Sequence, residues 1–209
     1  MALILFDFDG VLADTLDDLL QFGQEVCNEL GVHHHVVKED LSTLEVMSFA
    51  TYGRQLEVPD ALIEKFVQRC LEKIAEKESP PAIFTGLADV VRYLSKRHTL
   101  GVVTTNSAKN VQAFLAQHGL EDCILAIYGV DQPGSKAEKI SRARKKIGTA
   151  GEEVFMIGDA VSDVIAAKQA SAKSIAVSWG HQSLNNLIKA EPDYIVHATS
   201  EIVQLIDQA

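Results

Sequence analysis

The sequence ALILFDFDG (residues 2–10) is an apolar run that ends in two aspartates. Residues 2–8 are long enough for one strand that is buried on both faces, as the strands of a parallel sheet are. Asp7 and Asp9 alternate along the end of this strand, so their side chains point the same way. Gly10 lets the chain leave the strand without a steric penalty. The stretch therefore predicts a buried strand with a pair of carboxylates at its carboxyl end.

Apolar runs of similar length recur later in the chain and alternate with segments of helical periodicity. The runs occupy residues 100–105, 123–129, 153–159, 173–179 and 192–197. The helical segments occupy residues 87–97, 107–118, 136–147, 162–171 and 199–207. This alternation predicts an α/β fold, in which a parallel sheet is flanked by helices on both faces and the ligand site lies at the carboxyl ends of the strands.

One stretch, residues 16–79, interrupts the alternation, because it has no convincing strand and at least two amphipathic helices. In the second of these helices, Asp60 is the predicted N-cap. An apolar stripe with i, i+4 spacing follows at Leu62, Phe66, Cys70 and Ile74. Two prolines at 80–81 then end the segment, since proline cannot continue a helix. We therefore expect a core of residues 1–15 and 80–209, with a small all-helical insertion that hangs over the active site as a lid.

Composition limits the kinds of partner. The chain has 209 residues, of which 47% are hydrophobic and 23% charged, as in ordinary soluble globular proteins. Its formal net charge of -10 would repel a phosphate backbone, which argues against a nucleic-acid partner. The N-terminal apolar run lacks a basic flank and is broken by Asp7, so it predicts neither a signal peptide nor a membrane span. We expect a cytoplasmic protein, and the sequence carries no signal of its oligomeric state. Three widely spaced cysteines indicate buried thiols rather than disulfides or a zinc cluster, namely Cys27, Cys70 and Cys123.

Two further motifs place polar groups where strands end and helices begin. In VVTTNS (residues 102–107), Thr104 and Asn106 lie at a strand end, beside the free N–H groups of the following helix. Such a helix terminus suits a phosphate. Lys136, in GSKAEKI, is an ammonium group at the start of a helix that follows a glycine-containing loop.

The last motif, MIGDAVSD, adds two aspartates. Asp159 comes just past a strand and Asp163 about one helical turn later. Because the carboxyl ends of parallel strands share one rim, these carboxylates should meet Asp7 and Asp9. Each pair at about 4 Å would repel by roughly 4 kcal/mol at an effective dielectric of about 20. A positive charge must sit among them; hard oxygen ligands favour Mg²⁺, and Lys136 supplies the remainder.

The four motifs occur together and span nearly the whole chain. They resemble those of the haloacid dehalogenase superfamily, in the subgroup with a helical cap inserted after the first strand. The resemblance is carried by Asp7 and Asp9 in DFDG, Thr104 in VVTTN, Lys136 in GSKAEK, and Asp159 and Asp163 in GDAVSD. It implies a Rossmann-like core, residues 16–79 as the cap domain, and phosphoryl transfer through an aspartyl-phosphate.

The resemblance also implies roles for individual residues. Asp7 is expected to attack phosphorus as the nucleophile and to ligate Mg²⁺. Asp9 is expected to protonate the leaving oxygen, to activate water in the next step, and to offer its backbone carbonyl to the metal. Thr104 and the N–H of Asn106 are expected to hold phosphate oxygens. Lys136 is expected to neutralise the phosphoryl group and Asp7.

Two of these roles have structural alternatives. Asp159 is expected to bind Mg²⁺ directly, and Asp163 directly or through water. The alternative for Asp163 is to stabilise the first turn of its helix through the macrodipole. Lys139 is a nearby competitor of Lys136, which we favour because the family pattern places its lysine at the helix start.

Three other features favour structural roles. The histidines at 33–35 are adjacent, so they cannot all face one metal ion, and we expect a solvated loop. The loop at 179–181 follows a predicted strand near the rim and indicates packing on the phosphate side rather than catalysis. Arg54 is expected on the solvent face of the cap.

Two activities fit the motifs. One is a phosphatase of the phosphoglycolate-phosphatase-like kind, acting on a small phosphorylated metabolite; the other is a phosphosugar mutase resembling β-phosphoglucomutase. The core motifs do not separate these two. A 2-haloacid dehalogenase is disfavoured, because it needs neither Mg²⁺ nor the second acid, yet Asp9 and the acidic fourth motif are present. A phosphonate hydrolase would be expected to have a Schiff-base lysine in its cap, and we do not identify one. A phosphate-binding protein without activity has no need for the pair Asp7 and Asp9 together with the Mg²⁺ acids.

Overall fold

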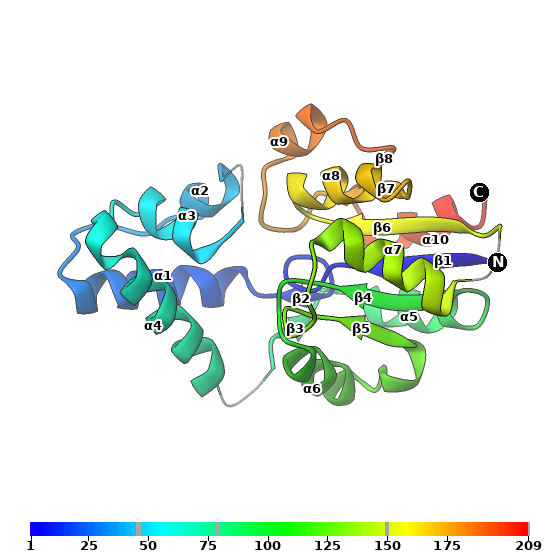
Figure 1. The fold of residues 1–209 in the computed structure, drawn as a ribbon, viewed down its shortest axis with the longest axis horizontal. Helices are drawn as coiled ribbons and strands as arrows, with labels where there is room; N and C mark the ends of the chain where they lie inside the picture. The colour runs from blue at the N-terminus through cyan, green and yellow to red at the C-terminus, as the bar shows by residue number, and fades with distance from the viewer. Residues whose placement is uncertain (45–46, 78–79, 149–150, 209) are drawn as a thin grey trace.

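A six-stranded parallel sheet forms the centre of the larger lobe (Figure 1). The computed structural model describes residues 1–44, 47–77, 80–148 and 151–208. The sheet has the strand order β5-β4-β1-β6-β7-β8. It consists of β1 (Ala2–Phe6), β4 (Thr99–Val103), β5 (Ala126–Tyr128), β6 (Glu153–Gly158), β7 (Lys173–Val177) and β8 (Tyr194–Val196). The predicted α/β fold with a parallel sheet is confirmed.

Helices cover both faces of this sheet. β1 lies between β4 and β6 and is buried from end to end. Its alternate residues serve opposite faces: Ile4 and Phe6 belong to one apolar core, and Leu3 and Leu5 to another. The first face is covered by α5 (Leu87–Ser95), α6 (Ala108–His118) and α10 (Thr199–Ile206). The second face is covered by α7 (Lys136–Ile147), α8 (Val161–Gln169) and α9 (Leu184–Lys189). A short 3-10 helix, η2 (Glu121–Cys123), precedes β5.

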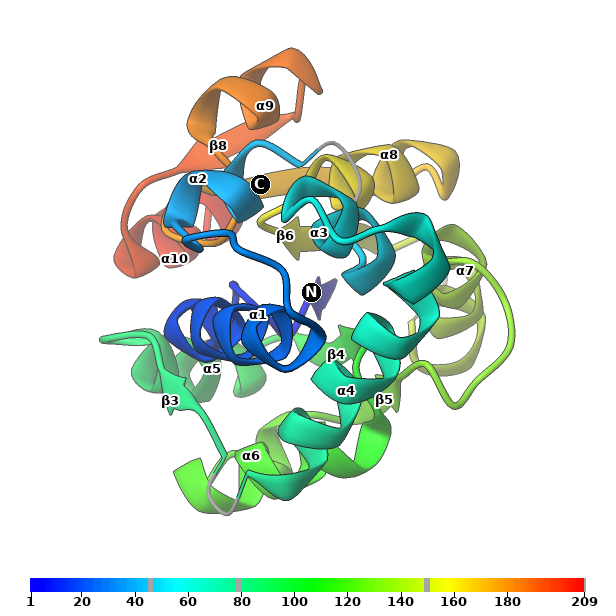
Figure 2. The same cartoon turned by 90° about the vertical axis from the view of Figure 1, so that its left-hand side faces the viewer.

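Residues 16–77, here called the helical segment, form a smaller lobe beside the carboxyl ends of the strands (Figures 1 and 2). Its elements are α1 (Leu16–Leu30), α2 (Lys38–Ser42), α3 (Phe49–Gln55), the 3-10 helix η1 (Asp60–Leu62) and α4 (Ile63–Glu76). They enclose an apolar core of their own, in which the rings of Tyr52 and Phe66 lie 6.0 Å apart. No strand occurs among the described residues of this segment.

The two passages between the lobes run side by side. Ala13–Asp14 (β2) pairs antiparallel with Ala82–Ile83 (β3). The division into a core of residues 1–15 and 80–209 and a cap of residues 16–79 stays a prediction, and residues 78–79 at its boundary lie outside the described part of the chain.

The structure differs from the prediction at several element ends. The N-cap predicted at Asp60 is wrong, because α4 begins at Ile63 and Asp60 instead opens η1, where its carboxylate accepts a hydrogen bond from Arg54 Nε at 3.2 Å. Asp7 lies past the end of β1 rather than within it. The pair β2–β3 and the short helix α9 were not expected. Within the described residues, no helix is both long and apolar enough to cross a membrane.

Candidate active site

The carboxyl ends of β1 and β6 place two aspartates next to each other. Asp7 follows β1, and Asp159 follows β6, the neighbouring parallel strand. The Asp7 N–H donates to the carbonyl of Ile157 at 2.8 Å, which continues the pairing one residue past the strand. Both aspartates are buried. The register of the sheet therefore brings two carboxylates to one point of its rim.

Asp163 joins this pair from the first turn of α8. One carboxylate oxygen from each of Asp7, Asp159 and Asp163 lies within 4.8 Å of the other two. Oδ2 of Asp163 also accepts the N–H of Ala160 at 3.1 Å, which fixes the side chain at the start of its helix. We call these three residues the acidic cluster.

Lys136, the first residue of α7, supplies the opposing charge. Its Nζ lies 2.9 Å from Oδ2 of Asp7 and 2.5 Å from Oδ1 of Asp163. The competitor Lys139 is buried nearby, but its Nζ faces the backbone carbonyl of Thr104 at 3.5 Å. The ammonium group within the acidic cluster is therefore that of Lys136.

Burial and repulsion change the ionisation of the cluster. Burial, reinforced by the charge of Asp7, raises the pKa of Asp159 to about 7. Burial also raises the pKa of Asp163 to about 7, although Lys136 acts in the opposite direction. Burial alone would lower the pKa of Lys136, but Asp163 and Asp7 hold it above its ordinary value. If all three carboxyl groups are ionised, their negative charge exceeds what one ammonium group can balance.

Asp9 has different partners from the acidic cluster. Its Oδ2 accepts a hydrogen bond from Nδ2 of Asn106 at 3.0 Å. Asn106 is held in turn by Asn110, whose Nδ2 donates to Oδ1 of Asn106 at 2.9 Å. Burial raises the pKa of Asp9 above its ordinary value, against the lowering effect of the bond from Asn106. A carboxyl group with a raised pKa is suited to general acid–base chemistry.

The predicted phosphate-binding residues lie together after β4. Thr104 is buried, and its Oγ1 accepts the N–H of Asn106 at 3.0 Å. Thr105, Asn106 and Ser107, rather than Thr104, line the adjoining cavity. The N–H of Asn106 therefore has a partner within the protein, which a phosphate oxygen would have to replace.

The loop after β7 contributes a residue that sequence reasoning did not assign to the site. The N–H of His181 donates to Oδ2 of Asp159 at 2.7 Å, and its Nε2 lies 3.2 Å from Oγ1 of Thr15. Gly180 packs so tightly that an added Cβ would lie 2.3 Å from Cβ of Asp159. A lone histidine in a loop has no spacing pattern, so the only signal was its place after a predicted strand near the rim.

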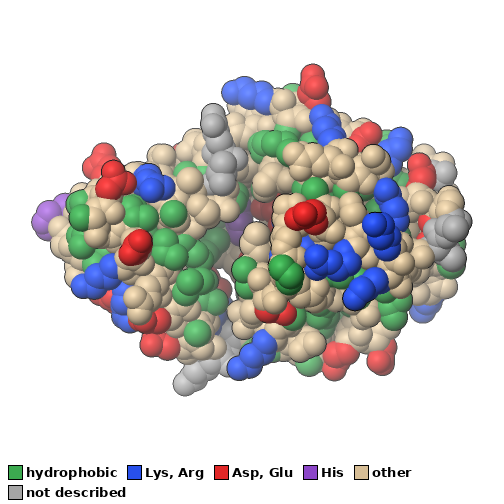
Figure 3. Space-filling view, viewed as in Figure 1, with side chains coloured by type: hydrophobic (Ala, Val, Ile, Leu, Met, Phe, Trp, Pro, Cys, Tyr) green, Lys and Arg blue, Asp and Glu red, His purple; other side chains and the backbone are tan. Residues whose placement is uncertain are grey.

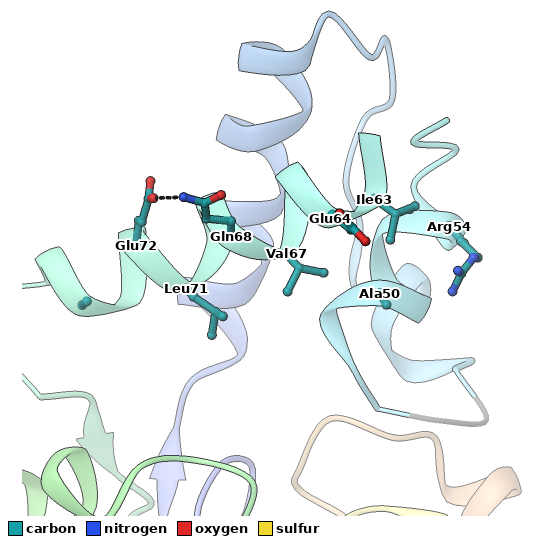
Figure 4. Close-up of a pocket in the computed structure, with 9 residues that line it drawn as sticks. Ala50, Arg54, Ile63, Glu64, Val67, Gln68, Leu71 and Glu72 are labelled. Carbon is teal, nitrogen blue, oxygen red and sulfur yellow. Dashed lines mark hydrogen bonds between the residues drawn. The ribbon is translucent and has the colours of Figure 1, made fainter. Parts of the chain in front are cut away.

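Two features of the helical segment lie away from the acidic cluster. His34 pairs with Asp40 inside the segment, with Nε2 3.1 Å from Oδ2. Arg54 is exposed, pairs with Asp60, and lines an open groove between α3 and α4 (Figure 4). Neither His34 nor Arg54 lines the cavity that contains Asp7.

A cavity of about 440 Å³ opens over the acidic cluster. The larger lobe contributes Asp7, Asp9, Lys136 and Asp159, and the helical segment contributes the opposite wall. Figure 3 shows the surface hollowed between the two lobes. The volume lies in the range of small-molecule sites, about 300–1,000 Å³.

The donor set of the acidic cluster fits Mg²⁺. Asp7, Asp159 and Asp163 offer carboxylate oxygens within 4.8 Å of one another, which are the hard ligands that Mg²⁺ prefers. Burial, with the charge of Asp7 added to it, raises the pKa of Asp159 and of Asp163 although Lys136 lowers both, so ionising the two carboxyl groups here is unfavourable without further positive charge. A divalent cation at this point would compensate the excess.

Known proteins are similar to this chain in sequence and in fold. The chain is 28% identical to a phosphoglycolate phosphatase of Synechococcus elongatus over 213 residues, which cover 100% of this chain and 98% of that protein. It is 26% identical to pyrophosphatase PpaX of Oceanobacillus iheyensis, over 97% of this chain and 95% of that protein. A haloacid dehalogenase-like hydrolase of Streptococcus pneumoniae has the same fold, with a TM-score of 0.85 and 23% identity over 99% and 98% of the two chains. The profile of the haloacid dehalogenase-like hydrolases matches residues 4–177, most of the chain, and this protein therefore belongs to that family.

Proposed function

We propose that this protein is a magnesium-dependent phosphatase that hydrolyses a small phosphate monoester through an aspartyl-phosphate on Asp7. One observation carries the proposal: the acidic cluster lies within 4.8 Å, with the Nζ of Lys136 2.9 Å from Oδ2 of Asp7. Similarity to a phosphoglycolate phosphatase and a pyrophosphatase supports phosphoryl chemistry.

Asp7 is the proposed nucleophile. Its Oδ1 accepts the N–H of Phe8 at 2.8 Å, which fixes the carboxylate, and its Oδ2 faces Lys136. A carboxylate oxygen of Asp7 forms the bond to phosphorus while the bond from phosphorus to the leaving oxygen breaks. Lys136 stays protonated, because the neighbouring carboxylates raise its pKa, and it offsets charge on the phosphoryl oxygens.

Asp9 is the proposed acid and base. Its carboxyl group gives a proton to the leaving oxygen in the first step. As a carboxylate it then takes a proton from the water that attacks the aspartyl-phosphate, which releases phosphate and restores Asp7. The chain of hydrogen bonds from Asn110 through Asn106 orients the Asp9 side chain for both transfers.

Asp7, Asp159, Asp163 and the backbone carbonyl of Asp9 are the proposed Mg²⁺ ligands. When bound, Mg²⁺ supplies positive charge that offsets the phosphoryl oxygens. The N–H groups of His181 and Ala160 hold the carboxylates of Asp159 and Asp163, respectively, in place.

The phosphate-binding residues complete the proposed site. Thr104 and the N–H of Asn106 hold phosphate oxygens once the hydrogen bond between them, 3.0 Å long, gives way to substrate. Residues 16–79 are the proposed cap domain on a core of residues 1–15 and 80–209. Helices of this segment wall the cavity on the side away from the acidic cluster, where they restrict water.

Hydrolysis of p-nitrophenyl phosphate in Mg²⁺ tests the proposal. We expect Asp7→Asn to lower kcat by at least about a thousandfold, because the nucleophile is lost, while circular dichroism shows the fold retained. Asp193→Asn, which changes an exposed aspartate bonded to Ser174, is the matched control and should keep full activity. Equal turnover by Asp7→Asn would refute the mechanism. Return of the phosphoryl group to a phosphosugar through a bisphosphate, without release of phosphate, would indicate the mutase instead.

A further inference from the structure

The cavity wall opposite the acidic cluster is uncharged across the described residues of the helical segment. Its side chains are chiefly apolar and include Leu19, Leu44, Met47, Phe49, Leu71 and Ile74. Ser48 and Tyr52 are the polar members, and both already have partners. Oγ of Ser48 accepts the N–H of Thr51 at the start of α3, and the hydroxyl of Tyr52 donates to the carbonyl of Leu19.

The apolar wall extends along α4 beyond the cavity. Leu71 and Ala75 line both the cavity and the open groove between α3 and α4. In Figure 4, Val67 and Leu71 project from one side of α4, while Gln68 and Glu72 bond to each other on the other side. Leu71 is 52% exposed, so a large apolar side chain faces the solvent-filled space over the site. Figure 3 shows hydrophobic side chains gathered on this lobe next to the hollow.

The described residues provide one cationic side chain in this cavity, Lys136, and it lies between Asp7 and Asp163. A second anionic group that reaches the wall formed by the helical segment would face leucine and phenylalanine side chains without a partner, and burying an unpaired charge is costly. A smaller cavity of about 260 Å³ shares Asp9 and contains Lys77 and Lys109, but it does not contain Asp7. Lys77 in that cavity already pairs with Asp18.

From this wall we infer the substrate class: the site takes phosphate monoesters of apolar alkyl or aromatic alcohols in preference to esters that carry a second anionic group. This inference rests on the proposed function. The phosphoryl group meets Asp7 and Lys136, and the alcohol packs against the apolar side chains of α3 and α4. Transfer of an apolar alcohol group from water to this wall is favourable, and this favours its esters over those that carry a second anionic group.

Two matched esters test the inference. Pentyl phosphate and the phosphate ester of 5-hydroxypentanoate have the same chain length and a primary leaving oxygen, and they differ in a terminal carboxylate. We expect kcat/KM in Mg²⁺ to be at least about tenfold higher for pentyl phosphate.

Two variants locate the preference. Leu71→Lys puts a cation on the wall without removing a buried side chain, so the ratio of kcat/KM between the two esters should fall by about tenfold or more. Leu125→Lys, at a 67% exposed leucine outside the cavity, should leave the ratio unchanged.

Each other result has a distinct meaning. Equal or faster turnover of the carboxylate ester by the wild type would overturn the inference and leave the proposed function standing. A preference for the carboxylate ester that disappears in Lys109→Ala would overturn it by placing the anion in the smaller cavity. Failure of the folded protein to hydrolyse any monoester in Mg²⁺ would overturn the proposed function itself.

Discussion

Asp159→Asn should stabilise the protein when no metal is present. Burial raises the pKa of Asp159 to about 7 from an ordinary value of 3.8. At about 1.4 kcal/mol for each pH unit, ionised Asp159 costs the metal-free fold about 4 kcal/mol above neutral pH. Asparagine has the same shape, lacks the charge, and can still accept the N–H of His181. Because neighbouring groups relax, we expect a gain on the order of 2 kcal/mol in the free energy of unfolding at pH 8.

The pH dependence of this gain is the sharper test. The folded-state pKa of Asp159 is raised, so the folded chain keeps a proton that the unfolded chain has released, and stability is lost as pH rises from about 4 to about 7. The advantage of Asp159→Asn should therefore shrink by up to about 2 kcal/mol between pH 8 and pH 5.5.

Urea unfolding in EDTA, followed by circular dichroism at both pH values, measures the gain. Asp193→Asn is a control for which we expect the opposite change in stability. Burial would raise the pKa of Asp193, but the N–H and hydroxyl of Ser174 hold it below its ordinary value. This variant should therefore be less stable than the wild type above about pH 4. If the stabilities of the wild type and of Asp159→Asn vary in parallel from pH 5.5 to pH 8, the claim that burial raises the pKa of Asp159 in the folded protein is refuted.

Three more outcomes follow from the same geometry. Excess Mg²⁺ should raise the Tm of the wild type more at pH 8 than at pH 5.5, because the proposed ligands Asp159 and Asp163, both with a pKa raised to about 7, would have to lose their protons to bind it. Thermal melts in Mg²⁺ and in EDTA at the two pH values measure this difference, and an equal rise in Tm contradicts it. Lys136→Met should lower kcat for p-nitrophenyl phosphate by at least about a hundredfold, since it removes the ammonium group beside Asp7 that is proposed to offset the phosphoryl charge. Turnover within a factor of a few of the wild type argues against this role of Lys136. Gly10→Ala should destabilise the fold by more than about 2 kcal/mol, because Gly10 has φ +76° and its added Cβ would lie 2.1 Å from Oδ2 of Asp159. Gly151→Ala, at φ +85° in open space, isolates the backbone contribution, and equal urea midpoints for the two variants would show that the contact with Asp159 does not matter.

Helices and strands whose apolar residues recur at regular spacing, or form an uninterrupted run, were predictable from the sequence. The run at 2–8 became β1, and α7 begins at Lys136, as its predicted range did. Elements without such a pattern were not predictable. The strands β2 and β3 have two residues each, which are too few to show an alternation of apolar and polar side chains. The N-cap at Asp60 failed because a 3-10 turn separates this residue from α4.

The same distinction applies to the site. Asp7 and Asp159 could be placed together from the sequence because adjacent parallel strands end at one rim. His181 contacts Asp159 because of the path of its loop, and Asn110 contacts Asn106 because of the orientation of its helix. Neither the loop path nor the helix orientation is indicated by the spacing of residues in the sequence. The inward-facing residues of the helical segment depend on its docking against the sheet, which no periodicity specifies.

The antiparallel pair formed by Ala13–Asp14 and Ala82–Ile83 has a consequence for how such a chain can change over time. It holds the entrance and exit of the intervening 67 residues next to each other, on the larger lobe. A segment with adjacent ends can be lengthened, shortened or exchanged while the strands on either side keep their register. The residues at the carboxyl ends of the strands and the helices that shape the cavity above them can thus diverge independently of each other.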